Sequence, residues 1–384
     1  MKKKFTLILI FILLFSLTAC TGKKNEKLVI GVQSIATHLN PLFYTNSDDE
    51  LALDLMFTKL FPVDREGNLL LSAGTVEGET SEDGYTYYGA ASLTTSLGDE
   101  SSYIYSIRLL DDLYCADGEE LTAKDLIFSL YVLLDPTYSG SVNLSSLPIK
   151  GLSDYQNAVN EALQIGNAED REEALLETYI SGINVIGNYV RIEMTRELTA
   201  DEMNILNIYV APLHHYGSLS LYSPSNNMFG FIKGDLSSIS SKGNTSIGYG
   251  PYILSSTGTT LTFSRNNAYY KGAAKIKTIQ IKLIYFSSTN GDGEVVTTDF
   301  YHSIDEDTID FARIIVDDYA RNEISRYNLN SLMIGNCLSL YTLGGDSIYG
   351  YITSTKRFDY SSIENLGLTD YYTYIDAIEY LNVQ

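Results

Sequence analysis

The sequence is poor in several residue types that carry specific chemistry. Its 384 residues include no tryptophan, three cysteines, four histidines and seven prolines. It also lacks a Gly-x-Ser-x-Gly segment, a His-Glu-x-x-His segment and a phosphate-binding glycine loop, which mark hydrolases, zinc proteases and nucleotide-binding enzymes. We therefore expect neither an enzymatic activity nor a cofactor.

Basic residues are scarce as well. The chain has 26 lysines and arginines against 48 aspartates and glutamates, a formal net charge of −22. A nucleic-acid-binding surface needs clustered positive charge to replace the counterions of phosphate, so nucleic acid is a poor partner for this chain. The acidity indicates a well-solvated surface, and attraction of cationic ligands is a second interpretation.

Two of the cysteines, Cys115 and Cys337, lie in the body of the chain. A single disulfide between them would be compatible with an exported protein, but a separation of more than 200 residues predicts no geometry. Two unpaired thiols are an equally good interpretation.

The N-terminus has the pattern of an export signal. Three lysines at positions 2–4 precede an uncharged, mostly apolar run over residues 5–17, which is shorter than the ~20 residues that a membrane-spanning helix needs. The following Leu17-Thr18-Ala19-Cys20 resembles a bacterial lipobox, in which a diacylglyceryl group alkylates the cysteine thiol. We predict a signal peptide over residues 1–19, lipid attachment at Cys20 and a tether over residues 20–27.

The clearest local pattern lies in residues 103–136. Apolar residues alternate from Tyr103 to Leu109, as in a strand with one buried face. Asp111, Asp112 and Asp117-Gly118 then crowd turn formers together, and Thr122 followed by Asp125 predicts a capped helix that begins near Ala123. Its apolar residues form a stripe wide enough to lie on a sheet, and Asp135-Pro136 ends it.

This succession resembles the signature of the family 5 extracellular solute-binding proteins, the oligopeptide and dipeptide receptors of ABC importers. The matching residues are Arg108, Asp111, Asp117-Gly118, Leu121-Thr122-Ala123, Asp125 and Asp135-Pro136. Further matches are Leu39-Asn40-Pro41, Leu60, Asp64, Gly67, Gly182 to Met194, Gly248-Tyr249-Gly250-Pro251-Tyr252 and Arg265 to Gly272. Two departures are an insertion at Leu109-Leu110 and Cys115 in place of an aromatic residue.

Outside the signature, turn residues and apolar periodicity predict most of the remaining elements. We expect helices over 48–60, 153–163, 168–179 and 307–319, hairpins over 85–93 and 183–194, and strands over 28–32, 248–254, 261–265, 276–284, 338–343 and 347–352. The last two strands would be joined by a turn at 344–346.

Histidine gives no strong metal signal. His214 and His215 are adjacent, and neighbours point ~100° apart on a helix and to opposite faces on a strand, so they rarely chelate one ion. His38 lies alone in a loop. We predict no metal site.

The resemblance implies an α/β protein of the two-lobed type II periplasmic-binding architecture. We expect a first lobe over residues 28–285, with an inserted subdomain at about 75–200, and a short or incomplete second lobe over residues 286–384. The loop after the first strand, Gln33, Ser34 and Ile35, would contact ligand, although a plain connecting loop is an equal interpretation.

The implied function is peptide capture for an ABC permease and ATPase by a monomer anchored on the extracellular or periplasmic side of the membrane. The alternatives are a sensory or degenerate lipoprotein of the same fold and a binder of nickel, haem or another small solute. If the second lobe is incomplete, oligopeptides should bind weakly or not at all, because a closed form needs ligand contacts from both lobes.

Overall fold

The computed structural model describes residues 27–32, 35–64, 67–82, 84, 86–243, 247–283, 288–289, 295–296, 309–315, 321–322, 325, 338–342 and 349–354. The predicted signal peptide, Cys20, Gln33, Ser34, Cys337 and the turn at 344–346 lie outside these residues.

The larger of two main sheets has seven strands. Their spatial order is β10 (Tyr252–Ser256), β11 (Thr260–Arg265), β12 (Thr278–Leu283), β1 (Lys27–Val32), β15 (Phe311–Ile315), β17 (Tyr349–Ser354) and β16 (Leu338–Thr342). β1 is parallel to β12 on one side and to β15 on the other, and the remaining pairs are antiparallel. With neighbours on both sides, β1 is buried from Leu28 to Val32, which explains its unbroken apolar run.

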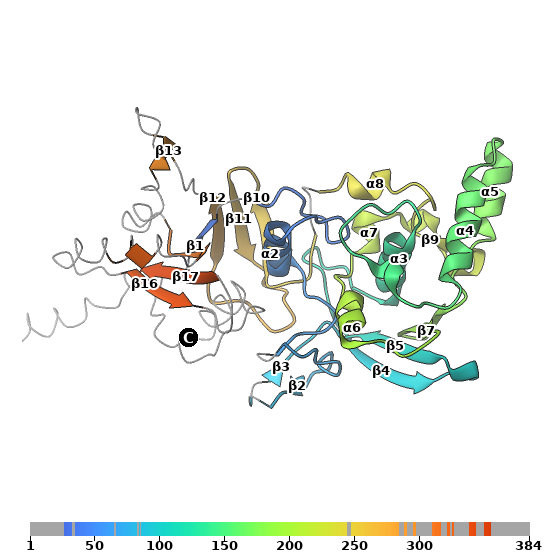
Figure 1. The fold of residues 1–384 in the computed structure, drawn as a ribbon, viewed down its shortest axis with the longest axis horizontal. Helices are drawn as coiled ribbons and strands as arrows, with labels where there is room; N and C mark the ends of the chain where they lie inside the picture. Colours follow the sequence, from blue (N-terminus) through green and yellow to red (C-terminus); the bar gives the residue numbers. More distant parts are fainter. Residues whose placement is uncertain are drawn as a thin grey trace, which may run out of the picture.

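The second main sheet lies at a distance from the first in the ribbon and is entirely antiparallel (Figure 1). Its strand order is β4 (Ala91–Leu97), β5 (Tyr103–Leu109), β7 (Tyr189–Met194) and β6 (Ile183–Ile186). β6 and β7 form the predicted hairpin, and Gly187 in their turn has a φ of 59°, which glycine adopts without strain. Short two-stranded ladders join β2 (Glu79–Thr80) to β3 (Thr86–Tyr87), β8 (Tyr222–Ser223) to β9 (Met228–Phe229) and β13 (Ser288–Thr289) to β14 (Val295–Val296).

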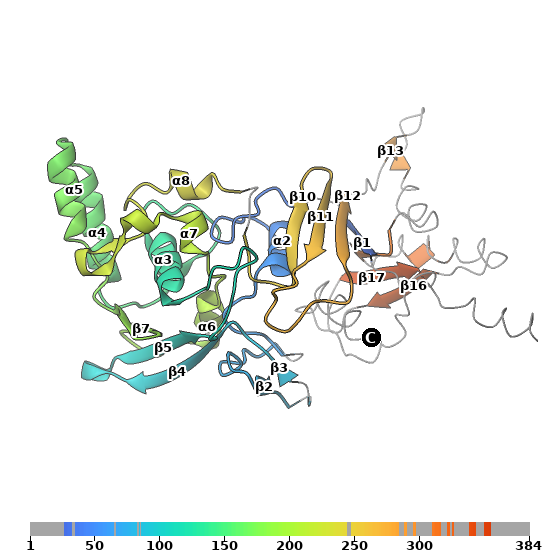
Figure 2. The ribbon, with the colours of Figure 1, turned by 180° about the vertical axis from the view of Figure 1, so that it is seen from behind.

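Seven α-helices are described. They are α2 (Ser47–Met56), α3 (Ala123–Leu134), α4 (Leu152–Leu163), α5 (Ala168–Leu176), α6 (Ala200–Leu206), α7 (Leu213–Tyr216) and α8 (Ser237–Ser240). α2 lies beside the seven-stranded sheet, and α4 and α5 lie at the opposite end of the molecule (Figures 1 and 2). Within the described part of the chain, no helix combines the length and the apolar character needed to cross a membrane.

The strand, turn and helix of the signature form as the sequence predicts. β5 spans Tyr103–Leu109, and α3 begins at Ala123 and ends at Leu134. The Thr122 N–H donates to the Asp125 carboxylate at 2.7 Å, so the predicted capping interaction is present. Burial of α3 is more extensive than a stripe, because every residue from Asp125 to Leu134 is buried. The helix therefore packs on several sides at once, against α7, β7 and β9.

Three predicted elements differ from the structure. Pairing with a distant segment overrides local propensity in the first and third, and pairing with neighbouring strands replaces the expected hairpin in the second. The helix expected to reach Leu60 ends at Met56, since Lys59 and Leu60 pair with Tyr209 and Ile208 in extended conformation. The hairpin expected over 85–93 does not form, because β4 pairs with β5 instead. The helix expected over 307–319 contains β15, a strand held between β1 and β17.

The strands that follow residue 286 bear on the expected lobes. β15, β17 and β16 belong to the same sheet as β1, so a boundary at residue 285 would divide one sheet. β4 to β7 all fall within the expected subdomain at 75–200. The domain limits themselves remain a prediction.

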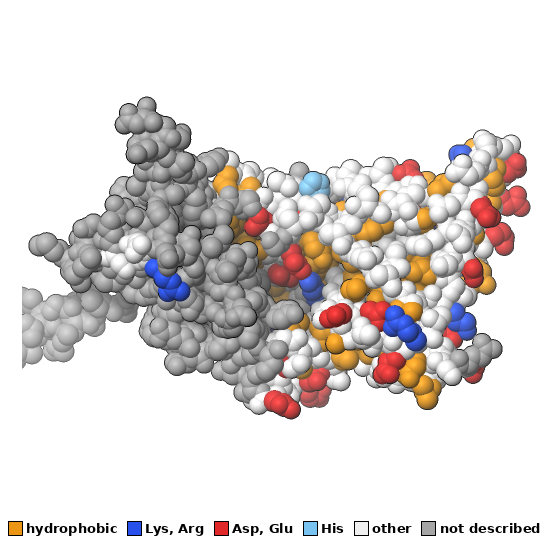
Figure 3. Space-filling view, viewed as in Figure 1, with side chains coloured by type: hydrophobic (Ala, Val, Ile, Leu, Met, Phe, Trp, Pro, Cys, Tyr) orange, Lys and Arg blue, Asp and Glu red, His pale blue; other side chains and the backbone are white. Residues whose placement is uncertain are grey.

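Acidic side chains gather at the end of the molecule formed by α4 and α5 (Figure 3). Glu169, Asp170, Glu172 and Glu173 are all exposed on α5.

The buried apolar residues of both main sheets form one continuous core that includes α2 and α3.

Leu130→Asp tests the packing of α3. Leu130 is fully buried, so an unpaired carboxylate there should lower the free energy of unfolding by ~4 kcal/mol or more. Chemical denaturation of the variant and of Lys124→Gln, a control at a half-buried position on the same helix, measures the effect. Equal stability of Leu130→Asp and the parent would show that α3 is not in the core.

Candidate functional site

The loop that follows β1 occupies a position where open α/β sheets commonly bind ligands. Both neighbours of β1 come later in the chain, one on each side, and both run parallel to it. The carboxyl ends of β12, β1 and β15 therefore meet at one edge of the sheet, at the point where the strand order changes direction. The chain leaves this edge directly after Val32, the last residue of β1.

Of the three residues predicted to contact ligand, Ile35 is described. It is half-buried and packs against the core, while Gln33 and Ser34 lie outside the described residues. A ligand-contact role for these three residues remains a prediction.

A single buried carboxylate organises the loop. Asp49, in the first turn of α2, is fully buried. Its Oδ1 accepts hydrogen bonds from the Thr37 N–H at 2.8 Å and the His38 N–H at 3.0 Å. Its Oδ2 accepts two more, from the N–H and the hydroxyl of Thr45, each at 3.0 Å. Asp49 therefore ties together the two ends of the loop.

The protonation of Asp49 reflects these contacts. Burial raises the pKa of the carboxyl group, but the hydrogen bonds from His38, Thr45 and Thr37 together hold it below its usual value. The group is thus ionised at neutral pH, and a charged acceptor makes each of its hydrogen bonds stronger than a neutral one would.

Segments far along the chain fix the middle of the loop. The Leu39 N–H donates to the Gly243 carbonyl at 2.9 Å, and the buried Asn40 amide donates to the Ile239 carbonyl at 2.8 Å. The hydroxyls of Tyr138 and Ser141 donate to the carbonyls of Leu42 and Tyr44, both at 2.6 Å. The loop is therefore held between α8 and the chain that follows α3.

Asp54 and Glu50 of α2 belong to a second polar cluster. The Tyr209 hydroxyl donates to the Asp54 carboxylate, and the Tyr44 ring meets the Tyr209 ring edge-on at 5.8 Å. Lys59 pairs with Glu50 at 2.6 Å. Burial raises the pKa of Asp54 to about 6, although Lys59 and the hydrogen bond from Tyr209 act in the opposite direction.

Gly248 and Gly250, which precede β10, allow this part of the chain to approach the end of α2. A Cβ atom at Gly248 would lie 1.9 Å from the Met56 carbonyl oxygen, and one at Gly250 would lie 2.5 Å from the Met56 carbonyl carbon. The Gly250 N–H donates to the same Met56 carbonyl at 2.7 Å. Any larger residue would push this strand entry away from the end of α2.

A model of the bacterial extracellular solute-binding proteins, family 5, matches residues 91–324, which is more than half of the chain. The chain belongs to this family. No curated protein matches it.

Solved structures of peptide-binding proteins share the fold. The lactococcal OppA complexed with an endogenous peptide has a TM-score of 0.53 and 19% identity, covering 83% of this chain and 51% of that one. The oligopeptide-binding protein AppA from Bacillus subtilis, in complex with a nonapeptide, has a TM-score of 0.50 and 15% identity, covering 82% of this chain and 47% of that one. The chain thus spans about half the length of these structures. This family 5 protein has the type II binding-protein fold that they share.

The sequence patterns did not single out Asp49 or Asp54. Asp48, Asp49 and Glu50 look alike as acidic residues of a helix start, and only the path of the loop shows that Asp49 accepts the Thr37 and His38 N–H groups. The Asn46 side chain caps α2, because its Oδ1 accepts a hydrogen bond from the Asp48 N–H at 3.0 Å.

Asp54→Asn should remove a pH dependence from stability. The folded-state pKa of about 6 lies above the ordinary value of 3.8. The contribution of Asp54 to the free energy of unfolding is therefore complete below pH 3.8 and is lost as pH rises through 6. Between pH 4 and pH 7, the free energy of unfolding of the variant should rise relative to that of the parent by at most ~3 kcal/mol, since one pKa unit corresponds to 1.36 kcal/mol.

Denaturation of both proteins across this pH range, with Asp48→Asn on the same helix as control, measures the difference. A stability difference between Asp54→Asn and the parent that stays constant from pH 4 to pH 7 would contradict the raised pKa.

Proposed function

We propose that this family 5 protein captures oligopeptides or dipeptides outside the cytoplasm and delivers them to an ABC permease and ATPase. The observation that carries the proposal is the loop after β1, whose residues 37–45 are anchored by hydrogen bonds near the switch point of the parallel strands. A loop in this position can present backbone groups to an extended peptide without first paying the free-energy cost of ordering itself.

Peptide is the favoured ligand class for two reasons. The family resemblance of the sequence is to peptide receptors, and two solved structures with the same fold contain peptide. The role is binding rather than catalysis, because the family consists of solute-binding proteins.

We further propose that Cys20 carries a diacylglyceryl anchor, so that the protein stays at the membrane surface. The support is the sequence Leu17-Thr18-Ala19-Cys20 directly after an apolar run. An anchored receptor remains near its permease, which raises the effective concentration of loaded receptor there.

Isothermal titration of the purified full chain with a mixed peptide library tests the function and the site separately. The parent should bind peptide, and Asp49→Ala should bind about tenfold more weakly, because ~1.4 kcal/mol of loop ordering would then oppose binding. Asp48→Ala, which leaves the Asp49 hydrogen bonds in place, should bind like the parent.

The possible failures are distinct. No heat of binding with the parent would refute peptide capture. Equal affinity of the parent and Asp49→Ala would leave peptide capture intact but place the binding site away from the loop after β1.

Cys20→Ser tests the anchor. The serine variant should incorporate no labelled palmitate and should move from the membrane fraction to the soluble fraction, because a hydroxyl does not form the thioether. Cys337→Ser is the matched control and should be labelled like the parent. Unchanged labelling of Cys20→Ser would exclude this lipid attachment.

A further inference from the structure

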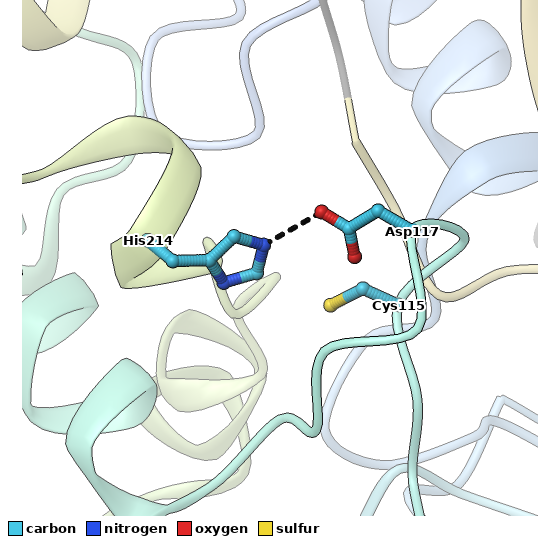
Figure 4. A group of neighbouring side chains, drawn as sticks. All are labelled: Cys115, Asp117 and His214. Atoms are coloured by element: carbon cyan, nitrogen blue, oxygen red, sulfur yellow. Dashed lines mark hydrogen bonds and ion pairs between the residues drawn. The ribbon is translucent and has the colours of Figure 1, made fainter.

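Three potential metal ligands from two separate segments converge beside α7. Cys115 and Asp117 lie in the turn between β5 and α3, and His214 lies on α7 (Figure 4). The His214 Nε2 is 2.9 Å from the Asp117 Oδ2, and one ligand atom from each of the three residues lies within 4.8 Å of the others. All three side chains point into the same space (Figure 4).

Backbone hydrogen bonds hold the turn in this shape. The Cys115 N–H donates to the Glu119 carbonyl at 2.8 Å, and the Gly118 N–H donates to the Cys115 carbonyl at 2.9 Å. Gly118 has a φ of 91°, a conformation that favours glycine. The Ala116 N–H also donates to the Gly248 carbonyl at 2.9 Å, which fixes the turn against the rest of the protein.

The histidine is fixed independently from the other side. The Asp125 carboxylate of α3 accepts a hydrogen bond from the Leu213 N–H at 2.8 Å, directly before His214 in the chain. Asp125 also caps its own helix, so one buried carboxylate fixes both the start of α3 and the start of α7. The backbone segments that carry the three residues are therefore held by hydrogen bonds other than the one between His214 and Asp117.

The local charge favours a cation. Three acidic residues, Asp117, Asp125 and Glu119, and one basic residue, Lys124, act electrostatically on Cys115. This excess of acidic over basic residues favours a divalent cation at the site.

The donor set selects among metals. Sulfur, imidazole nitrogen and carboxylate oxygen are the three ligand types that zinc accepts in proteins, whereas calcium and magnesium prefer oxygen alone. A tetrahedral ion bound by three side chains keeps a fourth position open.

An activated nucleophile is a poorer explanation for the same group. Burial raises the pKa of the Cys115 thiol, and the nearby carboxylates raise it further, so the thiol is protonated at neutral pH. The simplest structural alternative is that the His214–Asp117 hydrogen bond alone closes the turn on α7, with Cys115 as ordinary buried packing.

We propose that Cys115, Asp117 and His214 form a binding site for one zinc ion, with the fourth position open to water or another small donor. On binding, the S–H bond of Cys115 breaks, a sulfur–zinc bond forms and the proton passes to solvent, with no change in oxidation state. The ion would fasten the turn after β5 to α7.

Cobalt is a direct probe, because a thiolate bound to Co²⁺ gives a charge-transfer absorption band. The experiment uses the full chain with Cys20→Ser and Cys337→Ser, so that Cys115 is the one remaining cysteine. This protein should show the band on addition of Co²⁺, and Zn²⁺ should abolish it by displacement. In this protein the three proposed ligands are unchanged, so absence of the band would overturn the proposal.

Titration calorimetry with Zn²⁺ then tests each ligand in the same background. Cys115→Ser, Asp117→Asn and His214→Gln should each weaken zinc binding by about 100-fold or more, since even indirect partners of metal ligands contribute 10–100-fold. His215→Gln, the adjacent histidine, is the matched control and should bind zinc like its parent. Thermal melting should show a zinc-dependent rise in Tm for the parent and the control alone.

Asp117→Asn separates loss of a zinc ligand from misfolding. The Asp117 side chain is about one-third exposed, so its replacement should leave the protein folded. Unchanged zinc affinity in Asp117→Asn or Cys115→Ser would refute the site. Loss of binding in His215→Gln, equal to that in His214→Gln, would also contradict the proposed ligand set.

Discussion

The parallel pairing of β1 with two later strands is the constraint on which much of the structure depends. β1 is buried, and its backbone hydrogen bonds are shared between β12 and β15, which come from opposite sides. Asp310 closes this arrangement, because its carboxylate accepts the Val29 N–H and its own N–H donates to the Val29 carbonyl, both at 2.7 Å. A strand with parallel neighbours on both sides must leave the sheet at the edge where those neighbours also end, and this places the following loop at the switch point.

Buried carboxylates hold the chain segments near this position in a defined arrangement. Asp49 collects four hydrogen bonds from the loop, and Asp125 joins the start of α3 to the start of α7. A buried charge of this kind is stable only while its hydrogen bonds are complete, so each one rigidifies the segments that donate to it. The loop after β1 and the turn that carries Cys115 are consequently both held in place before any ligand binds. This supports a receptor whose binding groups are already arranged in the free protein.

The parts of the fold that the sequence predicted are those with local causes. β5, α3 and the β6–β7 hairpin follow from alternation, a capping pair and a Gly-Asn turn, and each forms at the expected residues. The end of α2 and the strand β15 could not be predicted in this way, because pairing with Tyr209 in the first case and with β1 in the second overrides the helical pattern. The same limit applies to the sites. The sequence predicts that Ile35 follows the first strand, but Asp49 is distinguished from Asp48 only by the path of the loop. Nothing in the local pattern indicates that His214 meets a turn almost one hundred residues earlier.

The central claim is that this family 5 protein holds a peptide at the edge of the sheet where β1 ends. Native mass spectrometry of the protein purified from the cells that produce it tests this most directly, because captured ligand remains bound and is identified by its own mass and fragmentation. The account predicts released species whose fragmentation spectra are those of peptides. A nickel complex, haem, a sugar or the absence of any released ligand would contradict it.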